Sequence, residues 1–100
     1  MRAIHLAHLD KTRPVLVLTR DIVRPHMERV TVAPITSRVR GLSTEVPVGR
    51  ANGLEHDSVV SCDNIVTIPK AALGRQVGGL LEAQERDLAL AITLAFDLLT

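Results

Sequence analysis

The sequence predicts a mainly β protein of the α+β class, in which a compact, barrel-like antiparallel sheet carries one long C-terminal helix. Three observations indicate this fold. Six short segments with strand character lie within residues 2–68, whereas the last twenty residues form one apolar helical segment. The chain of 100 residues is 46% hydrophobic but contains only one aromatic residue, Phe96, so its core must be aliphatic. We expect one domain over residues 1–100.

The predicted strands are short and differ in how they are covered. They span residues 2–9, 15–19, 30–36, 43–48, 58–62 and 65–68. The continuous apolar run at 15–19 is typical of a strand buried on both faces. The alternating segment 43–48 indicates an exposed edge strand. Within 30–36, Pro34 cannot donate to a ladder, so it requires a bulge or an edge position.

Turn residues separate these strands. The charged segment 20–28 is interrupted by Pro25 and predicts a loop with one helical turn. The Asn52-Gly53 pair is the clearest turn signal in the chain. Residues 69–73 are expected to form a short helix that Pro69 opens. The three glycines at 74, 78 and 79 are then expected to interrupt the chain before the long helix.

Residues 80–99 are predicted to form the long helix. Its polar side chains make one narrow stripe of Glu82, Arg86, Thr93, Asp97 and Thr100. Two apolar faces remain, namely Leu88, Ile92, Ala95, Phe96 and Leu99 on one and Leu90, Leu94 and Leu98 on the other. The sheet of so small a domain covers only one of them, so we expect a second copy of the chain to cover the other.

Composition excludes several classes of protein. A single aromatic residue excludes modules that stack bases on aromatic platforms. The lone Cys62 excludes a disulfide framework and a multi-cysteine zinc site, and it is expected to be a small core residue. The N-terminus lacks the apolar run of a signal peptide, and the apolar stretch at 88–99 is too short to span a bilayer. These features predict a cytoplasmic protein without membrane contact.

Charge is distributed unevenly along the chain. Residues 1–50 carry nine basic and four acidic side chains, whereas residues 51–100 carry three basic and seven acidic ones. Ten of the twelve basic residues are arginines, which suit bidentate contacts to phosphate or carboxylate. Two interpretations remain open. The first is a solvated surface whose net charge changes sign along the chain, and the second is an anion-binding face that contacts RNA, DNA or an acidic peptide.

The histidines do not predict a metal site. His5 and His8 are separated by an odd number of positions, so on a strand they point to opposite faces and have unrelated partners. His26 and His56 are expected in surface loops. No glycine-rich phosphate loop is present, since Gly78-Gly79 lacks the surrounding pattern. We therefore expect neither a metal nor a cofactor.

Two polar residues at predicted strand ends suggest a site. Arg13 precedes the buried strand at 15–19, and Thr36 ends the strand at 30–36. If these strands are neighbours, both side chains lie at one rim of the sheet. A guanidinium and a hydroxyl held there would bind a phosphodiester, the arginine as a bidentate clamp and the threonine as a donor to a phosphate oxygen. The alternative is that both are ordinary solubilising residues.

Five segments, in order, resemble the MazF/PemK family of toxin endoribonucleases. They are Arg13–Leu18 (RPVLVL), Val32–Ser37 (VAPITS), Thr44–Val48 (TEVPV), Asn52–Val60 (NGLEHDSVV) and Asp63–Ile68 (DNIVTI). The resemblance implies an SH3-like barrel with a C-terminal helix, a fold that the MazF and CcdB toxins share. It also implies a homodimer that cuts single-stranded mRNA at short sequences without a metal, through the substrate's 2′-hydroxyl, leaving a cyclic phosphate and a 5′-hydroxyl.

The resemblance assigns roles to individual residues. The family's essential arginine falls on Arg13 and its essential threonine on Thr36. Arg13 would stabilise the phosphorane charge and Thr36 would hold a phosphate oxygen. Further RNA contacts are expected from the polar residues near these two, namely Lys11, Thr12, Arg20, Ser37, Arg38 and Arg40.

The sequence departs from the family before Arg13. Many relatives carry a longer loop there, with a G-S-E-Q-x-G pattern that supplies a glutamate, whereas this chain passes directly from His8 through Thr12 to Arg13. The general base is therefore unassigned, and Asp10 and His8 are the nearest candidates. RNA recognition would differ as well.

The resemblance also implies partners and leaves alternatives. A MazE-like antitoxin would lay an acidic, disordered C-terminal tail across the basic groove, and operator DNA would be contacted only through that antitoxin. One alternative is a non-catalytic toxin like CcdB that binds DNA gyrase, although the ending at 96–100 lacks the expected Trp-Gly-Ile. Another is an inert relative that only represses its operon.

Overall fold

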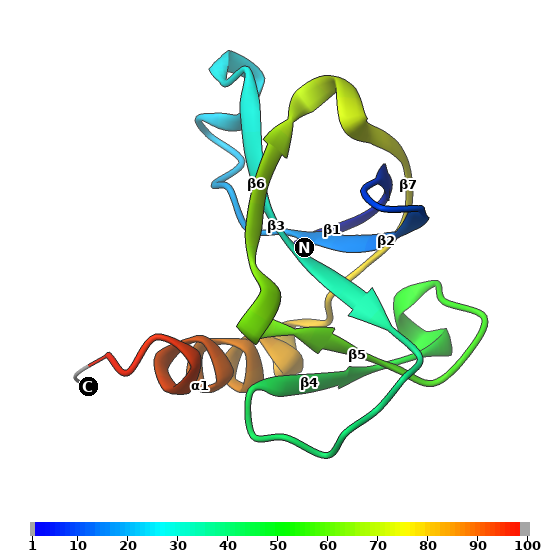
Figure 1. Cartoon of the computed structure of the whole chain (residues 1–100), viewed down its shortest axis with the longest axis vertical. Coiled ribbons are helices and arrows are strands. Elements are labelled where there is room, and N and C mark those ends of the chain that lie inside the picture. The colour runs from blue at the N-terminus through cyan, green and yellow to red at the C-terminus, as the bar shows by residue number, and fades with distance from the viewer. Residues whose placement is uncertain (1, 99–100) are drawn as a thin grey trace.

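The computed structural model describes residues 2–98 and shows seven strands followed by a C-terminal helix (Figure 1). The strands are β1 (Ala3–His8), β2 (Thr12–Val17), β3 (Arg29–Thr36), β4 (Glu45–Val48), β5 (Ser58–Ser61), β6 (Val66–Pro69) and β7 (Leu73–Gly79), and the helix is α1 (Glu85–Ala95). Five 3₁₀ turns lie between them: η1 (Arg24–His26), η2 (Arg50–Asn52), η3 (Cys62–Asn64), η4 (Lys70–Ala72) and η5 (Glu82–Gln84). The predicted mainly β fold with a C-terminal helix is confirmed.

All strand pairs are antiparallel, and β3 is the strand that joins the parts of the sheet. The order is β4-β5-β3-β2-β1-β7, with β6 also paired to β3. Residues 29–32 of β3 pair with β6, whereas Ile35 and Thr36 pair with β5. Pro34 lies between these two stretches, where the absence of an N–H costs no ladder bond on that edge. The strand β4 lies at the end of the sheet, as its alternating pattern predicts.

The aliphatic core has two parts that β2 separates. Leu16 packs beneath α1 with Ile4, Leu80 and Leu88. Val15 and Val17 point to the opposite face and pack with Ala7, Val30, Val32 and Ile68. The first three residues of the predicted run, Val15, Leu16 and Val17, are at most 2% exposed, which explains why their sequence is continuously apolar.

Cys62 belongs to the part of the core beneath α1 and is fully buried, as expected. Burial, together with the neighbouring Asp63 carboxylate, raises the pKa of its thiol from the ordinary 9.0 to about 11. The thiol is therefore protonated and unreactive at neutral pH.

The glycine-rich segment after residue 72 is a strand, so the predicted interruption is wrong. Residues 73–79 form β7, which pairs with β1 across two register shifts. The reason for its composition lies in tertiary contacts. A Cβ on Gly78 would come within 1.8 Å of the carbonyl oxygen of Asn52, and one on Gly53 within 2.3 Å of the carbonyl oxygen of Val77. These two glycines allow the turn at 52–53 to rest directly on β7.

The helix is shorter than the predicted 80–99. Leu80 continues the strand, since its N–H donates to the carbonyl of Arg2 at 2.8 Å, and α1 begins only at Glu85. The helix ends before Phe96, whose side chain is 55% exposed instead of sharing the face of Leu88. Leu99 and Thr100, which the prediction also included, lie outside the described residues.

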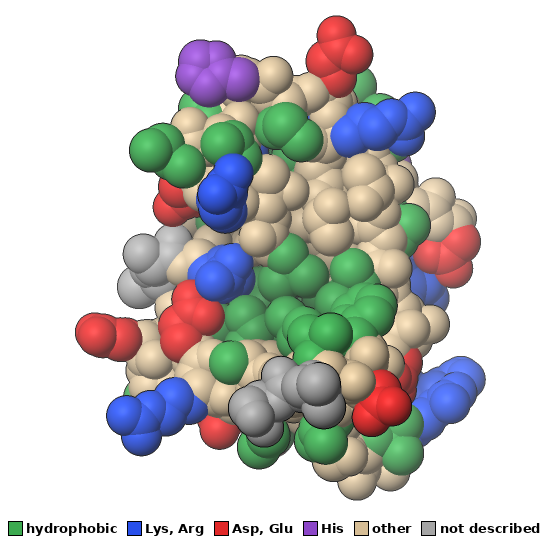
Figure 2. All heavy atoms as spheres, turned by 90° about the vertical axis from the view of Figure 1, so that its left-hand side faces the viewer, with side chains coloured by type: hydrophobic (Ala, Val, Ile, Leu, Met, Phe, Trp, Pro, Cys, Tyr) green, Lys and Arg blue, Asp and Glu red, His purple; other side chains and the backbone are tan. Residues whose placement is uncertain are grey.

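The second apolar face of the helix is uncovered. Leu90, Leu94 and Leu98 are 60%, 48% and 54% exposed, whereas Leu88 and Ala91 are buried against the sheet. Figure 2 shows the side of the molecule toward which the helix runs, where hydrophobic side chains gather in a hollow with charged groups around it. Among residues 2–98, no helix is long and apolar enough to cross a membrane.

Candidate functional site

Arg13 and Thr36 lie on two neighbouring strands and line the same grooves. Val15 on β2 lies opposite Pro34 on β3, so continuing this antiparallel register by two residues sets Arg13 opposite Thr36. Directly opposed residues share a face of the sheet, which brings both side chains to one rim. Arg13 lies within β2, where it pairs with Ala7, and not before the strand as the sequence indicates.

Two surface grooves meet at this pair. The first groove has a volume of about 530 Å³ and includes Lys11, Thr12, Ser37, Glu55, His56 and Arg75 in its lining. The second groove has a volume of about 690 Å³ and includes Asp10, Arg38, Arg40, Glu45, Asp63 and Asn64. Arg13 and Thr36 line both grooves. An extended ligand that runs from one groove to the other would pass over the side chains of Arg13 and Thr36.

Arg13 has free hydrogen-bonding capacity. Its Nη2 donates to Oδ2 of Asp10 at 3.1 Å, and its side chain is 24% exposed. Its Nε is buried and has no hydrogen-bond partner. The N–H groups of the guanidinium other than the one bonded to Asp10 have no partner among the described residues, so the exposed part of the group can donate to an anionic oxygen at the rim. Asp10 therefore fixes one side of the guanidinium and leaves the other for a ligand.

The hydroxyl of Thr36 is also ready to donate. Its Oγ1 accepts a hydrogen bond from the backbone N–H of Arg38 at 3.1 Å. Because a hydroxyl carries one hydrogen in addition to its acceptor lone pairs, the proton of Thr36 remains available to a phosphate oxygen. The same contact turns the chain into the loop that carries Arg38 and Arg40.

Glu45 holds that loop in place. Its carboxylate accepts hydrogen bonds from the backbone N–H groups of Arg40, at 3.2 and 3.3 Å, and of Leu42, at 3.0 Å. The loop is thus organised by backbone contacts, while the side chains of Arg38 and Arg40 line the second groove. Their position gives this groove two exposed positive charges beside Thr36.

The remaining predicted residues divide between these grooves and other parts of the surface. Lys11, Thr12 and Ser37 line the first groove. Arg20 lies beyond the other end of β2, in a separate depression with Arg2 and Glu85. It is therefore not brought together with Arg13 and Thr36.

The two candidate bases have other partners. Asp10 lines the second groove but is paired with Arg13. His8 lines neither groove, and its Nδ1 shares a hydrogen bond with Oγ1 of Thr12 at 2.9 Å. His5 hydrogen-bonds instead to the carbonyl of Gly74, so the prediction of unrelated partners for the two strand histidines is confirmed. Within residues 2–98, no group of three or more metal-ligating side chains forms.

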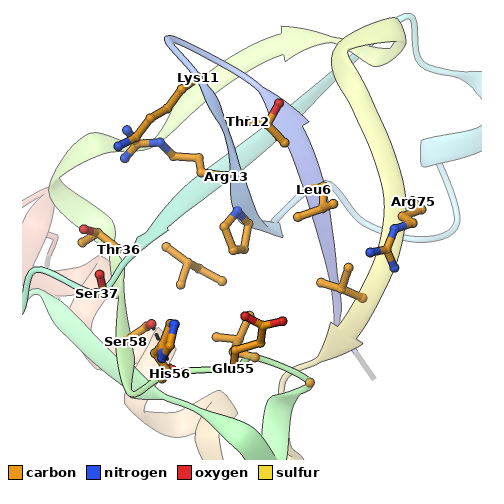
Figure 3. A pocket seen from close by; sticks show the side chains of 15 residues that line it. Leu6, Lys11, Thr12, Arg13, Thr36, Ser37, Glu55, His56, Ser58 and Arg75 are labelled. Atoms are coloured by element: carbon orange, nitrogen blue, oxygen red, sulfur yellow. Dashed lines mark hydrogen bonds between the residues drawn. The ribbon is translucent and has the colours of Figure 1, made fainter.

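Sequence reasoning missed four polar residues of the first groove. Glu55, His56 and Ser58 form the wall opposite Arg13, and Arg75 lies at the far end (Figure 3). The segment at 52–60 was recognisable as a family motif, but nothing local places it against β2. Arg75 lies in β7, a segment that is not predicted as a strand because it is rich in glycine.

Comparison with known proteins identifies the class. The family model of PemK-like, MazF-like toxins of type II toxin–antitoxin systems matches residues 4–96. The chain therefore belongs to this family, as the sequence motifs predict. Endoribonuclease MazF3 of Mycobacterium tuberculosis is 66% identical over 98 residues, which cover 98% of this chain and 95% of that protein.

Solved structures agree with this assignment. The Mycobacterium tuberculosis toxin MazF-mt6 superposes with a TM-score of 0.98 at 65% identity, covering 99% of this chain and all of that one. An endoribonuclease in complex with its cognate antitoxin, from Mycobacterial species, gives a TM-score of 0.87 at 24% identity, covering 98% and 94% of the two chains. The second similarity concerns the fold alone. Together they confirm the predicted fold class.

Proposed function

We propose that this protein is the toxin of a type II toxin–antitoxin system and cuts single-stranded mRNA as a sequence-specific endoribonuclease. The observation that carries the proposal is the pair of Arg13 and Thr36 at the meeting point of two grooves, each with an unused donor. Two donors from adjacent strands suit the oxygens of one phosphodiester. Two similar proteins of Mycobacterium tuberculosis, endoribonuclease MazF3 and probable endoribonuclease MazF5, support the same activity by their names.

In the proposed reaction the nucleophile belongs to the RNA itself. The substrate's 2′-hydroxyl attacks the adjacent phosphorus, the bond to the 5′-oxygen breaks, and a cyclic phosphate and a 5′-hydroxyl result. Arg13 stabilises the negative charge that develops on the phosphorane, and Thr36 donates to a non-bridging oxygen. Lys11, Thr12, Ser37, Arg38 and Arg40 contact the strand on either side, whereas Arg20 would contact RNA only outside the two grooves.

Two partners complete the proposal. A second copy of the chain covers the exposed leucines of α1, giving a homodimer. A MazE-like antitoxin inhibits the toxin with an acidic tail, which competes with RNA for the basic groups of the grooves. A fold relative solved with its cognate antitoxin is consistent with such a partner.

Cleavage of a mixed single-stranded RNA in the presence of EDTA tests the proposal. The wild-type protein should cut at a short, recurring sequence and leave cyclic phosphate ends. Arg13→Ala and Thr36→Ala should lose cleavage while retaining the circular dichroism spectrum of the wild type. Arg86→Ala is the matched control, because this arginine is exposed on α1 and lines neither groove. Absence of cleavage by folded wild-type protein would contradict the proposal and would favour a protein-binding toxin, for which inhibition of DNA gyrase is the next assay.

A further inference from the structure

The first groove contains a histidine that no assigned role uses. His56 lies in the loop between η2 and β5, is exposed, and lines the groove beside Ser58 (Figure 3). Its position follows from the sheet, because Val59, three residues later, pairs with Thr36. The imidazole therefore lies just before β5, the strand that neighbours Thr36, on the wall opposite Arg13.

Three carboxylates that line the second groove already have partners. Asp10 is paired with Arg13, Glu45 accepts from two backbone N–H groups, and Asp63 accepts from the hydroxyl of Thr44 at 2.6 Å. Among the carboxylates and histidines of the described residues that line the grooves, Glu55 and His56 make no side-chain hydrogen bond or ion pair. Within the described part of the chain, the side chains of Lys11, Arg38, Arg40 and Arg75 are also without such partners, but these cationic groups are protonated and do not act as bases. These two are thus the groups available to exchange a proton with a substrate.

Chemistry favours the imidazole over the carboxylate. An effective base has its titration near the working pH, and histidine is the side chain that ordinarily titrates between pH 5 and 8. Glu55 lies farther along the wall from Thr36 (Figure 3). We propose that His56 accepts the proton of the 2′-hydroxyl during cleavage, an inference that depends on the ribonuclease function proposed above.

The loop that presents His56 is held at both ends. The turn at 52–53 rests against β7 through Gly53 and Gly78, and Ser58 enters the ladder opposite Val48. Only four residues span the interval between Gly53 and Ser58. The imidazole is therefore carried by a short wall whose two ends belong to the core, which limits the positions it can reach.

Water takes part in the proposed reaction as the proton donor to the leaving oxygen, so that all protons are accounted for. As the bond between the 2′-oxygen and phosphorus forms, the 2′-proton passes to the neutral imidazole of His56. The bond from phosphorus to the 5′-oxygen breaks, and that oxygen takes a proton from water. The imidazolium then returns its proton to the hydroxide so formed. The products are the cyclic phosphate and the 5′-hydroxyl, and the protein is unchanged.

The charged groups that face this imidazole come from three elements. Glu55 is its neighbour on the loop, Lys11 and Arg13 come from the hairpin of β1 and β2, and Arg75 comes from β7. Asp57 lies on the other side of the loop, against Gly49. The pH dependence of cleavage must therefore be compared between variants that differ only at residue 56.

Single-turnover cleavage tests the proposal. The substrate is a short RNA that contains the sequence cut by the wild type, the enzyme is saturating, and the pH runs from 5 to 8. The cleavage rate of His56→Gln should fall by at least about a hundredfold, and the rise of the wild-type rate with pH should disappear. His26→Gln is the matched control, because His26 is an exposed histidine at the end of η1, outside both grooves. Free imidazole should restore cleavage by His56→Ala.

Binding is measured separately with the same RNA carrying a 2′-O-methyl group at the attacked nucleotide. The affinity of His56→Gln for this RNA should stay within about threefold of the wild type. A weaker affinity with a normal saturated rate would overturn the proposal and assign His56 to recognition. An unchanged rate and pH profile would also overturn it, whereas loss of cleavage in Arg13→Ala would show that the ribonuclease function still stands. If folded wild type cuts no RNA, the underlying function is wrong instead.

Discussion

Asn52 and Gln84 join the groove wall to the start of the helical region, through a hydrogen bond of 2.6 Å from Nδ2 of Asn52 to Oε1 of Gln84. Asn52 is 2% exposed, and its side chain also donates to the carbonyl of Gly79 and accepts from the N–H of Gly49, each at 3.0 Å. One buried amide thus connects the turn, the end of β7 and η5. A buried polar side chain is retained in a core only when it is satisfied in this way.

Replacement of Asn52 should destabilise the protein strongly. Asn52→Ala leaves the carbonyl of Gly79 and the N–H of Gly49 without partners, so the free energy of unfolding should fall by about 2–3 kcal/mol. Urea denaturation monitored by circular dichroism measures it. Asn64→Ala is the control, because Asn64 is exposed and contacts only Ser61, and its cost should stay within about 0.5 kcal/mol. Equal effects of the two variants would contradict the role of Asn52.

Gly78 should not tolerate a side chain. In Gly78→Ala the new Cβ meets the backbone of Asn52, which has no flexible end to move, so the loss of stability should be about 3 kcal/mol or more. In Gly41→Ala, nothing lies within 4 Å and only the backbone at φ +76° resists, so about 1 kcal/mol is expected. Thermal denaturation compares the two. A ranking in which Gly41→Ala is the more destabilising would show that β7 and the turn separate easily.

These contacts also explain which parts of the fold the sequence predicts. The strands from β1 to β6 follow from alternation, apolar runs and turn residues, which are local signals. The strand β7 does not, because Gly78 is chosen by a contact with Asn52, 26 positions away in the chain. The start of α1 is misjudged for a similar reason. Leu80 is apolar enough for a helix, but its N–H is taken by Arg2 at the edge of the sheet.

The same distinction between local signals and tertiary contacts applies to the candidate site. Arg13 and Thr36 are predictable because neighbouring strands bring their ends together and the motifs around them are specific. Glu55, His56 and Arg75 are not, because their approach to Arg13 depends on how the turn at 52–53 seats on β7. Arg20 shows the converse error. It is close to Arg13 in sequence, but the length of β2 separates them.

The exposed helix face should control assembly. Leu94→Glu introduces a charge at the centre of a face formed by Leu90, Leu94 and Leu98, and it should convert the proposed dimer into monomers. Size-exclusion chromatography with light scattering measures the mass. Arg86→Glu puts the same residue at an exposed position on the polar stripe of this helix and should leave the dimer intact. A dimer that survives Leu94→Glu would locate the interface elsewhere.

Cys62 should make stability depend on pH in the alkaline range. The pKa of its thiol is about 11 when folded and near 9.0 when unfolded, so the folded protein holds the proton more tightly. Its contribution is complete below pH 9 and is lost as the pH rises to 11, at a total cost of about 3 kcal/mol. Urea denaturation at several pH values measures the decline. The chain contains no tyrosine, which keeps this window simple. Cys62→Ala should decline less, and parallel curves would contradict the assignment.

The close backbone contact between Gly53 and Gly78 forms a seam, and this seam determines which residues of the groove wall can be substituted. Between this seam and β5, the side chains of Glu55, His56 and Asp57 are exposed, so the stability of the core does not depend on their identity. The two ends of this loop are fixed by the fold, whereas the exposed side chains of Glu55 and Asp57 are free to change. Substitutions of Glu55 and Asp57 can therefore change the surface of this loop one residue at a time, without a compensating change in the barrel, whereas His56 is constrained by the role proposed for it.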